Sequence, residues 1–175
     1  MAILSTDNLL IERSGTHYKA PVSALPSGSD PWTWIKLASN STVSTTAFAN
    51  VSGMSFTGSA NTTYIVDVFG AYQTAATTTG IGLALDVTAT STVIGINLVA
   101  LSATTLGGTE QVADATTTGA TTGVRAINTN TPIQARWIVA IGGTGGTVQL
   151  MQRSEVAASN TVLQSAITAL GYRAI

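Results

Sequence analysis

The chain has 175 residues, the length of one ordinary domain that can bury a core of its own. Its net charge is −1 at pH 7, so neither nucleic acid nor an anionic membrane surface is an expected partner. The sequence contains no cysteine, which excludes a disulfide framework and a cysteine-based metal site.

Charged residues are unusually rare. They make up 9% of the sequence, whereas about 25% is typical of a soluble domain. Threonine and serine supply the polar surface instead, and threonine favours strands because its Cβ atom is branched. A monomer with so few charges is poorly protected against self-association, so we expect further copies or a larger particle to cover much of its surface. No stretch predicts a secretory signal or a spanning helix.

The first 31 residues differ in composition from the rest. Two short extended runs, residues 8–13 and 16–20, flank Ser14 and Gly15, which predicts a small hairpin. Residues 26–31 have the composition of a linker. So short a segment buries little surface and should be ordered only where it docks. We therefore divide the chain into an N-terminal arm with its linker, residues 1–31, and a domain of residues 32–175.

Residues 32–175 read as strands separated by turn signals, with no convincing helical period. The pattern predicts an all-β fold, an antiparallel β-sandwich or jelly roll. The last expected strand also fits the spacing of a helix, although we favour a strand. Residues 104–123 are expected to form one long loop. The expected strands are 32–38, 47–51, 54–57, 62–73, 81–87, 92–101, 123–129, 132–141, 147–153 and 161–172.

Two of the expected strands, residues 92–101 and 133–141, are apolar on both faces. One face of an antiparallel sheet normally meets solvent. A second apolar face therefore indicates an interface between subunits. The alternative is a central strand in a sandwich that is covered on both sides.

The inventory of reactive side chains is short, and it predicts a protein that is not an enzyme and holds no metal or cofactor. His17 is the sole histidine and lies in the arm, where a catalytic triad is implausible. Asp67 and Asp86 are the one carboxylate pair worth testing for glycoside hydrolysis. Surface carboxylates paired with Arg136 or Arg125 are the favoured reading. The glycine-rich residues 142–146 lie between two strands and so form a hairpin loop rather than a phosphate-binding loop.

Aromatic side chains offer a further possibility, because tryptophan and tyrosine rings stack on sugars. Packing in the core is the favoured role, above all for a tryptophan at the start of the first sandwich strand. The candidates are Trp32, Trp34, Trp137, Tyr64 and Tyr72.

Several motifs resemble those of tailed-bacteriophage virion proteins. Residues 7–13 (DNLLIER) and 16–19 (THYK) resemble the attachment segment at the front of such proteins. The stretch from 34 to 64 looks like the first half of their β-sandwich domain, through WIKLA, FANVSGMSF and ANTTY. The ending GYRAI, residues 171–175, is similar to the closing strand. This resemblance implies a jelly-roll knob, usually trimeric, that is mounted on a capsid or tail through its N-terminal arm.

We therefore expect a virion structural protein, a capsid decoration or cement protein located on the capsid surface and made in the cytoplasm of a bacterial host. Its expected partners are two further copies in a homotrimer and the major capsid protein or another virion protein. The alternative is a short tail or head fibre knob that binds a host-surface glycan through loops at 73–80 and 104–123. The expected attachment residues are Leu9, Leu10, Ile11, Arg13, Tyr18 and Lys19.

Overall fold

The computed structural model describes residues 31–100, 105–112, 120–121, 123–124 and 126–175, together with the backbone of two strands within residues 8–21. The chain divides into two units, Met1–Pro31 and Trp32–Ile175, and each is described by itself. No helical segment within the described residues has the length and hydropathy that crossing a bilayer requires.

The first unit contains a two-stranded antiparallel pairing of β1 (Asn8–Arg13) with β2 (Thr16–Pro21). The backbone register sets Leu10 opposite Lys19 and Ile11 opposite Tyr18. The hairpin pairing expected from the two extended runs is confirmed.

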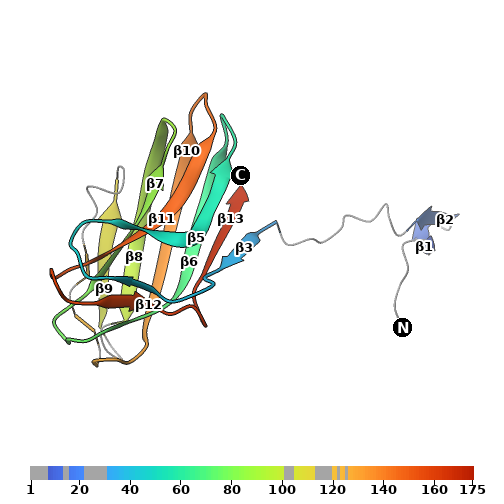
Figure 1. Ribbon diagram of the computed structural model, residues 1–175. Coiled ribbons are helices and arrows are strands. Elements are labelled where there is room, and N and C mark those ends of the chain that lie inside the picture. The colour runs from blue at the N-terminus through green and yellow to red at the C-terminus, as the bar shows by residue number, and fades with distance from the viewer. Residues whose placement is uncertain are drawn as a thin grey trace. The chain divides into compact units, whose positions relative to one another are not determined.

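The second unit is an antiparallel β-sandwich, as the alternating pattern predicted (Figure 1). The larger sheet has eight strands, six of them in the order β3-β13-β6-β10-β8-β9, while β12 pairs with β6 and β4. The smaller sheet has the order β5-β11-β7. The strands are β3 (Thr33–Lys36), β4 (Ser41–Val43), β5 (Ala49–Gly58), β6 (Thr63–Thr74), β7 (Ile81–Val87), β8 (Ser91–Ala100), β9 (Leu106–Gln111), β10 (Thr131–Ile141), β11 (Gly146–Ser154), β12 (Thr161–Leu163) and β13 (Ala169–Ala174).

The core lies between the two sheets and is built by alternation along the strands. Every second residue of β8 and β10 is buried, and Trp137 in β10 is completely enclosed. Gly95 lies directly opposite Trp137 on β8, where any Cβ atom would overlap the indole ring. The tryptophan therefore fills a space that only glycine leaves open.

Polar side chains from the large sheet close the free edge of β7 in the small sheet. The side-chain amide of Gln111 on β9 behaves like a peptide group of an added strand. It donates to the carbonyl oxygen of Leu85 at 2.7 Å and accepts from the Leu85 N–H at 3.0 Å. Asn97 donates to the carbonyl oxygen of Leu83 at 2.7 Å. These buried bonds satisfy backbone groups that would otherwise have no partner and tie the two sheets together at this edge.

The expected strand over residues 161–172 is wrong in its continuity, and its helical alternative is also wrong. Both β12 and β13 pair with the same edge of β6, but residues 164–168 between them face only residues 70 and 71 of that strand. The surplus leaves the ladder as a turn, closed by a bond from the Ile167 N–H to the Gln164 carbonyl oxygen. The spacing of apolar residues in 161–172 continues through the turn at residues 164–168, so it gives no sign of the interruption.

Three further expectations need correction. The expected strands 47–51 and 54–57 are not separate, because Gly53 adopts a positive φ of 75° without turning the chain back and residues 49–58 form one strand, β5; residues 47 and 48 lie outside it. Residues 126–130 form a turn in which Asn128 has a φ of 50°, so the expected strand over 123–129 is wrong there. The expected long loop over 104–123 contains β9.

Candidate functional site: the outer face of the large sheet

The large sheet carries an apolar face that points away from the core, which we call the outer face. It is formed by alternate residues of six strands, and the residues between them point toward the core. The strand registers align these residues in three rows across the sheet. The rows are Lys36, Ala169, Phe69, Gln134, Leu98 and Gly108; then Trp34, Gly171, Asp67, Arg136, Ile96 and Glu110; then Arg173, Ile65, Ile138 and Ile94.

Large aliphatic side chains stand exposed on this face. The exposed fractions are 56% for Ile94, 53% for Ile96 and 51% for Ile138. These three come from two neighbouring strands, β8 and β10, and therefore lie together rather than singly. Contiguous apolar patches are unusual on monomers and mark surfaces of interaction. The sequence predicted this second apolar face from the same two strands.

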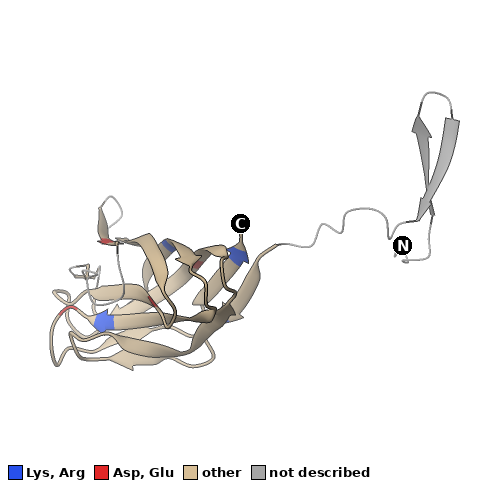
Figure 2. Cartoon of the chain, turned by 90° about the horizontal axis from the view of Figure 1, so that it is seen from above, with Lys and Arg blue, Asp and Glu red and all other residues tan. Residues whose placement is uncertain are grey.

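The outward face of the small sheet is different in kind. Its central strand β11 sets Thr147 beside Thr57 and Gln149 between Ser55 and Asp86. These side chains are polar, and the amide nitrogen of Gln149 donates to the carbonyl oxygens of Val51 and Met54. Lys, Arg, Asp and Glu are sparse along the described ribbon of the sandwich (Figure 2). Among the described residues of the two sheets, the large exposed apolar side chains therefore lie on the outer face of the large sheet.

A single ion pair lies in the middle of the outer face. The Nε and Nη2 atoms of Arg136 donate to the two carboxylate oxygens of Asp67, each at 2.6 Å. The Asp67 side chain is only 4% exposed, whereas that of Arg136 is 56% exposed. The hydrogen bond to Asp67 and its charge raise the pKa of Arg136 above its usual value. The carboxylate is thereby neutralised locally, and the guanidinium edge remains accessible.

The proposed carboxylate pair for glycoside hydrolysis is not assembled. Asp67 belongs to β6 in the large sheet, and Asp86 belongs to β7 in the small sheet, so they do not lie on paired strands. The expected partner Arg136 holds Asp67 in an ion pair instead. Arg125 lies outside the described residues. Within the described part of the chain, no group of three His, Cys, Asp or Glu side chains could hold a metal ion.

Basic and acidic residues mark opposite margins of the outer face. Lys36 and Arg173 lie near the β3 margin, and Glu110 lies on β9 at the other margin. The guanidinium carbon of Arg173 lies 5.3 Å from the ring centre of Trp32. Glu110 occupies the middle row, while Lys36 and Arg173 occupy the rows on either side of it. The face is therefore polarised across its width.

The aromatic candidates divide into two groups. Trp137, Tyr64 and Tyr72 are buried in the core, as the packing interpretation predicted. That interpretation is wrong for Trp34, which is 47% exposed and stacks on Trp32 with ring centres 5.6 Å apart. The Trp34 ring covers Gly171, where a Cβ atom would come within 2.6 Å of it.

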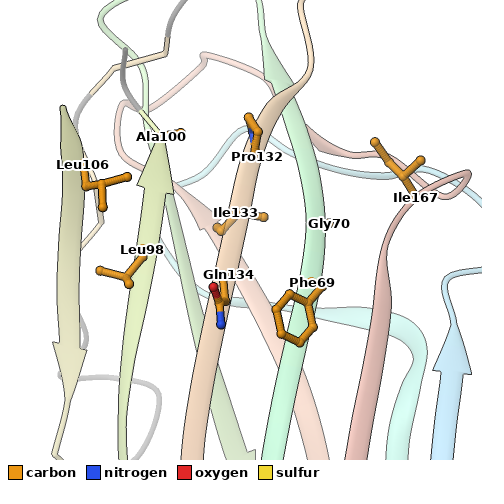
Figure 3. A pocket seen from close by; sticks show the side chains of 9 residues that line it. All are labelled: Phe69, Gly70, Leu98, Ala100, Leu106, Pro132, Ile133, Gln134 and Ile167. Atoms are coloured by element: carbon orange, nitrogen blue, oxygen red, sulfur yellow. The ribbon is translucent and has the colours of Figure 1, made fainter. Parts of the chain in front are cut away.

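An apolar groove of about 380 Å³ crosses the outer face near one end. Its floor lies over β10, at Pro132 and Gln134, and its walls are Leu98 on one side and Phe69 on the other (Figure 3). Figure 3 shows Leu98, Gln134 and Phe69 side by side on three neighbouring strands, as the register requires. The sequence did not reveal this hollow, because its lining also includes Ile167, which comes from the turn between β12 and β13.

The expected attachment residues lie in the first unit. Leu9, Leu10, Ile11 and Arg13 belong to β1, while Tyr18 and Lys19 belong to β2. Their side chains, like that of His17, lie outside the described part of the structure. Their role in attachment stays a prediction.

Comparisons with known proteins yield weak structural similarities alone. No known family model matches the sequence, and no curated protein is significantly similar to it. A structure of infectious bursal disease virus, Gt strain, is similar with a TM-score of 0.22 and 12% identity, over 97% of this chain and 43% of that one. The VP2 subviral particle of the same virus gives a TM-score of 0.22 and 13% identity over the same shares of the two chains.

This chain therefore spans less than half the length of those viral chains. TM-scores this low mean that the similarity carries no argument about function or assembly. The resemblance to tailed-phage virion proteins, drawn from sequence motifs, stays a prediction. What the protein does must be argued from its own surface.

Proposed function

We propose that this protein is a virion structural protein without catalytic activity, and that it decorates the outside of a bacteriophage capsid. The observation that carries the proposal is the outer face of the large sheet, where Ile94, Ile96 and Ile138 are each about half exposed. Such a surface requires a covering partner, and 9% charged residues would defend a free monomer poorly. A protein that lives within an assembly meets both conditions.

In this proposal the two units have separate tasks. The arm, residues 1–31, binds the major capsid protein or another virion protein. Leu9, Leu10, Ile11 and Tyr18 supply apolar contacts, while Arg13 and Lys19 pair with acidic groups of the shell. The sandwich stands on the capsid surface as a compact knob. Attachment across neighbouring shell subunits would add buried area and so stabilise the shell against the pressure of its genome.

The decisive measurement is the copy number of this protein in purified particles relative to the major shell protein. A decoration protein is expected at a copy number of the same order as the shell protein. A count of only a few knobs per particle would overturn decoration and support a tail or vertex location.

Attachment through the arm has its own test in the full chain. We expect a variant with Leu10→Asp and Ile11→Asp to lose binding to undecorated capsids while its circular dichroism is unchanged. The control is Val156→Asp, which places one such charge at an exposed residue of the sandwich. Binding that survives the arm substitutions would refute attachment through the arm.

The second candidate is a fibre knob that binds a host glycan. The observation that favours it is the exposed ring of Trp34, stacked on the partly buried Trp32, since aromatic faces suit sugar rings. Glycan-array binding that disappears in Trp34→Ala would support it. An array without any signal, from particles that carry the protein, would remove it.

A further inference from the structure

We propose that the outer face binds a second copy of this chain, face to face, about a two-fold axis that runs along the strands between β6 and β10. This inference does not rest on a role in a virion, because it concerns the purified protein alone. It commits to one partner for the apolar face and to one geometry. The resemblance to phage proteins implies a trimer instead, so the two ideas differ in a measurable mass.

The extent of the face is suited to such a contact. Six strands, with five spacings of about 4.8 Å, make it about 24 Å wide. From Pro132 to Ile138 it runs six residues, or about 20 Å at 3.4 Å each. The product of this width and length, about 480 Å², is the flat area of the outer face. A stable interface needs roughly 800 Å² of accessible surface per partner, which the corrugated face and its polar margins together approach.

The order of the strands makes the face suitable for pairing with itself. The axis divides the path β3-β13-β6-β10-β8-β9 into three strands on each side. Rotation about it keeps each row at its own height and sets β6 over the partner's β10, β13 over β8 and β3 over β9. An isologous contact of this kind is complete with two copies. Packed sheets cross at about 30°, which displaces the margins by about 6 Å, a distance that lysine and arginine side chains can span.

The groove then receives a side chain from the partner. Phe69 and Gln134 lie opposite each other in one row, one strand on each side of the axis. The rotation therefore sets each Phe69, which is 40% exposed, above the partner's Gln134, between its Phe69 and Leu98. The inserted side chain, Phe69, and the part of the groove over Gln134 lie on neighbouring strands of the same chain, as a self-complementary contact requires.

The charges at the margins agree with the same axis. The rotation brings Glu110 of one copy to the β3 margin of the other, at the height between Lys36 and Arg173. A two-fold axis across the strands would instead set β3 over β3 and like charges together. The Asp67–Arg136 pairs of the two copies also come side by side, each carboxylate facing the partner's exposed guanidinium edge. Charge complementarity therefore selects a second copy as the occupant and the axis along the strands.

The first test is the mass of the full chain, measured by sedimentation over a range of concentrations. We expect two chains per particle and a shift to one chain in Phe69→Asp and in Ile96→Asp, with at least 100-fold weaker association. The control Val156→Asp, at another exposed apolar residue, should leave the dimer intact. A wild-type mass of one or three chains, or dissociation by the control alone, would overturn the proposal.

A charge exchange tests the geometry without relying on apolar substitutions. Lys36→Glu or Glu110→Lys alone should weaken the dimer about tenfold, since each occurs twice in the contact. The double variant should restore association. Lys36 and Glu110 lie five strands apart in one chain, about 24 Å, so restoration has no explanation within a subunit. Additive weakening in the double variant would refute this axis.

Discussion

The side chain of Gln111 bonds to the free edge of β7, where no other described strand pairs with the small sheet. Its oxygen accepts from the N–H of Leu85 at 3.0 Å and from the indole N–H of Trp137 at 2.8 Å, and its nitrogen donates to the carbonyl oxygen of Leu85 at 2.7 Å. Gln111→Met keeps the length of the side chain but leaves three buried polar groups without this partner. Each costs about 1–2 kcal/mol if the backbone relaxes slightly, so we expect a loss of about 3–6 kcal/mol. That is a large part of the usual stability of a domain, about 5–15 kcal/mol.

The measurement is the free energy of unfolding in guanidinium chloride, followed by far-UV circular dichroism. It must be made at one protein concentration, because association stabilises the folded state. The control is Gln73→Met, which removes an exposed bond of 2.8 Å to Asn130 and should cost less than about 0.5 kcal/mol. If Gln111→Met cost less than about 1 kcal/mol, the amide would not be the partner that closes the edge of β7.

Two further predictions concern the core. Burial raises the pKa of Tyr72 to about 12 from 10, so its contribution to stability is complete below pH 10 and is lost between pH 10 and 12. Tyr72→Phe should lower the free energy of unfolding by about 1 kcal/mol at pH 7, because the bond to the Gly123 carbonyl oxygen is lost. Above pH 10 the free energy of unfolding should fall less steeply in this variant than in the wild type. Parallel pH profiles of the two proteins would contradict this prediction. In the guanidinium chloride assay, Gly95→Ala should cost about 1–3 kcal/mol because its methyl group overlaps Trp137, whereas Gly143→Ala, with open space around it, should be nearly neutral.

Alternation of side chains made most of the sandwich predictable. Along 81–87 the alternation predicts that Ile81, Leu83, Leu85 and Val87 point inward; the first three are fully or almost fully buried and Val87 is partly buried, while Ala84, expected outward, is buried as well. The exposed second face of β8 and β10 followed from the same rule, applied where both sets of alternate residues are apolar. A period of two is local information, so it can be read wherever glycine or a bulge does not interrupt the strand.

The errors arose where a distant partner decides the local structure. Residues 106–111 look like a loop because Gly107 and Gly108 interrupt the pattern, yet β8 pairs with them and makes them an edge strand. Trp34 looks like a core residue by size alone, but Gly171 on the neighbouring strand provides a surface on which its ring lies outside the core. Neither pairing has a signal in the nearby sequence. The groove is a product of such pairings and could not be foreseen either.

The pairing of β3 with β13 affects how the protein is made. It joins Thr33–Lys36, at the start of the sandwich, to residues 169–172, near its end. The sheet therefore cannot be completed during synthesis until almost the whole domain has left the ribosome. Contacts between such distant residues also slow folding, because the chain loses the entropy of loop closure before the stabilising contacts form. A nascent chain with unpaired apolar strands would be exposed to aggregation in that interval, and its folding should depend strongly on chaperones.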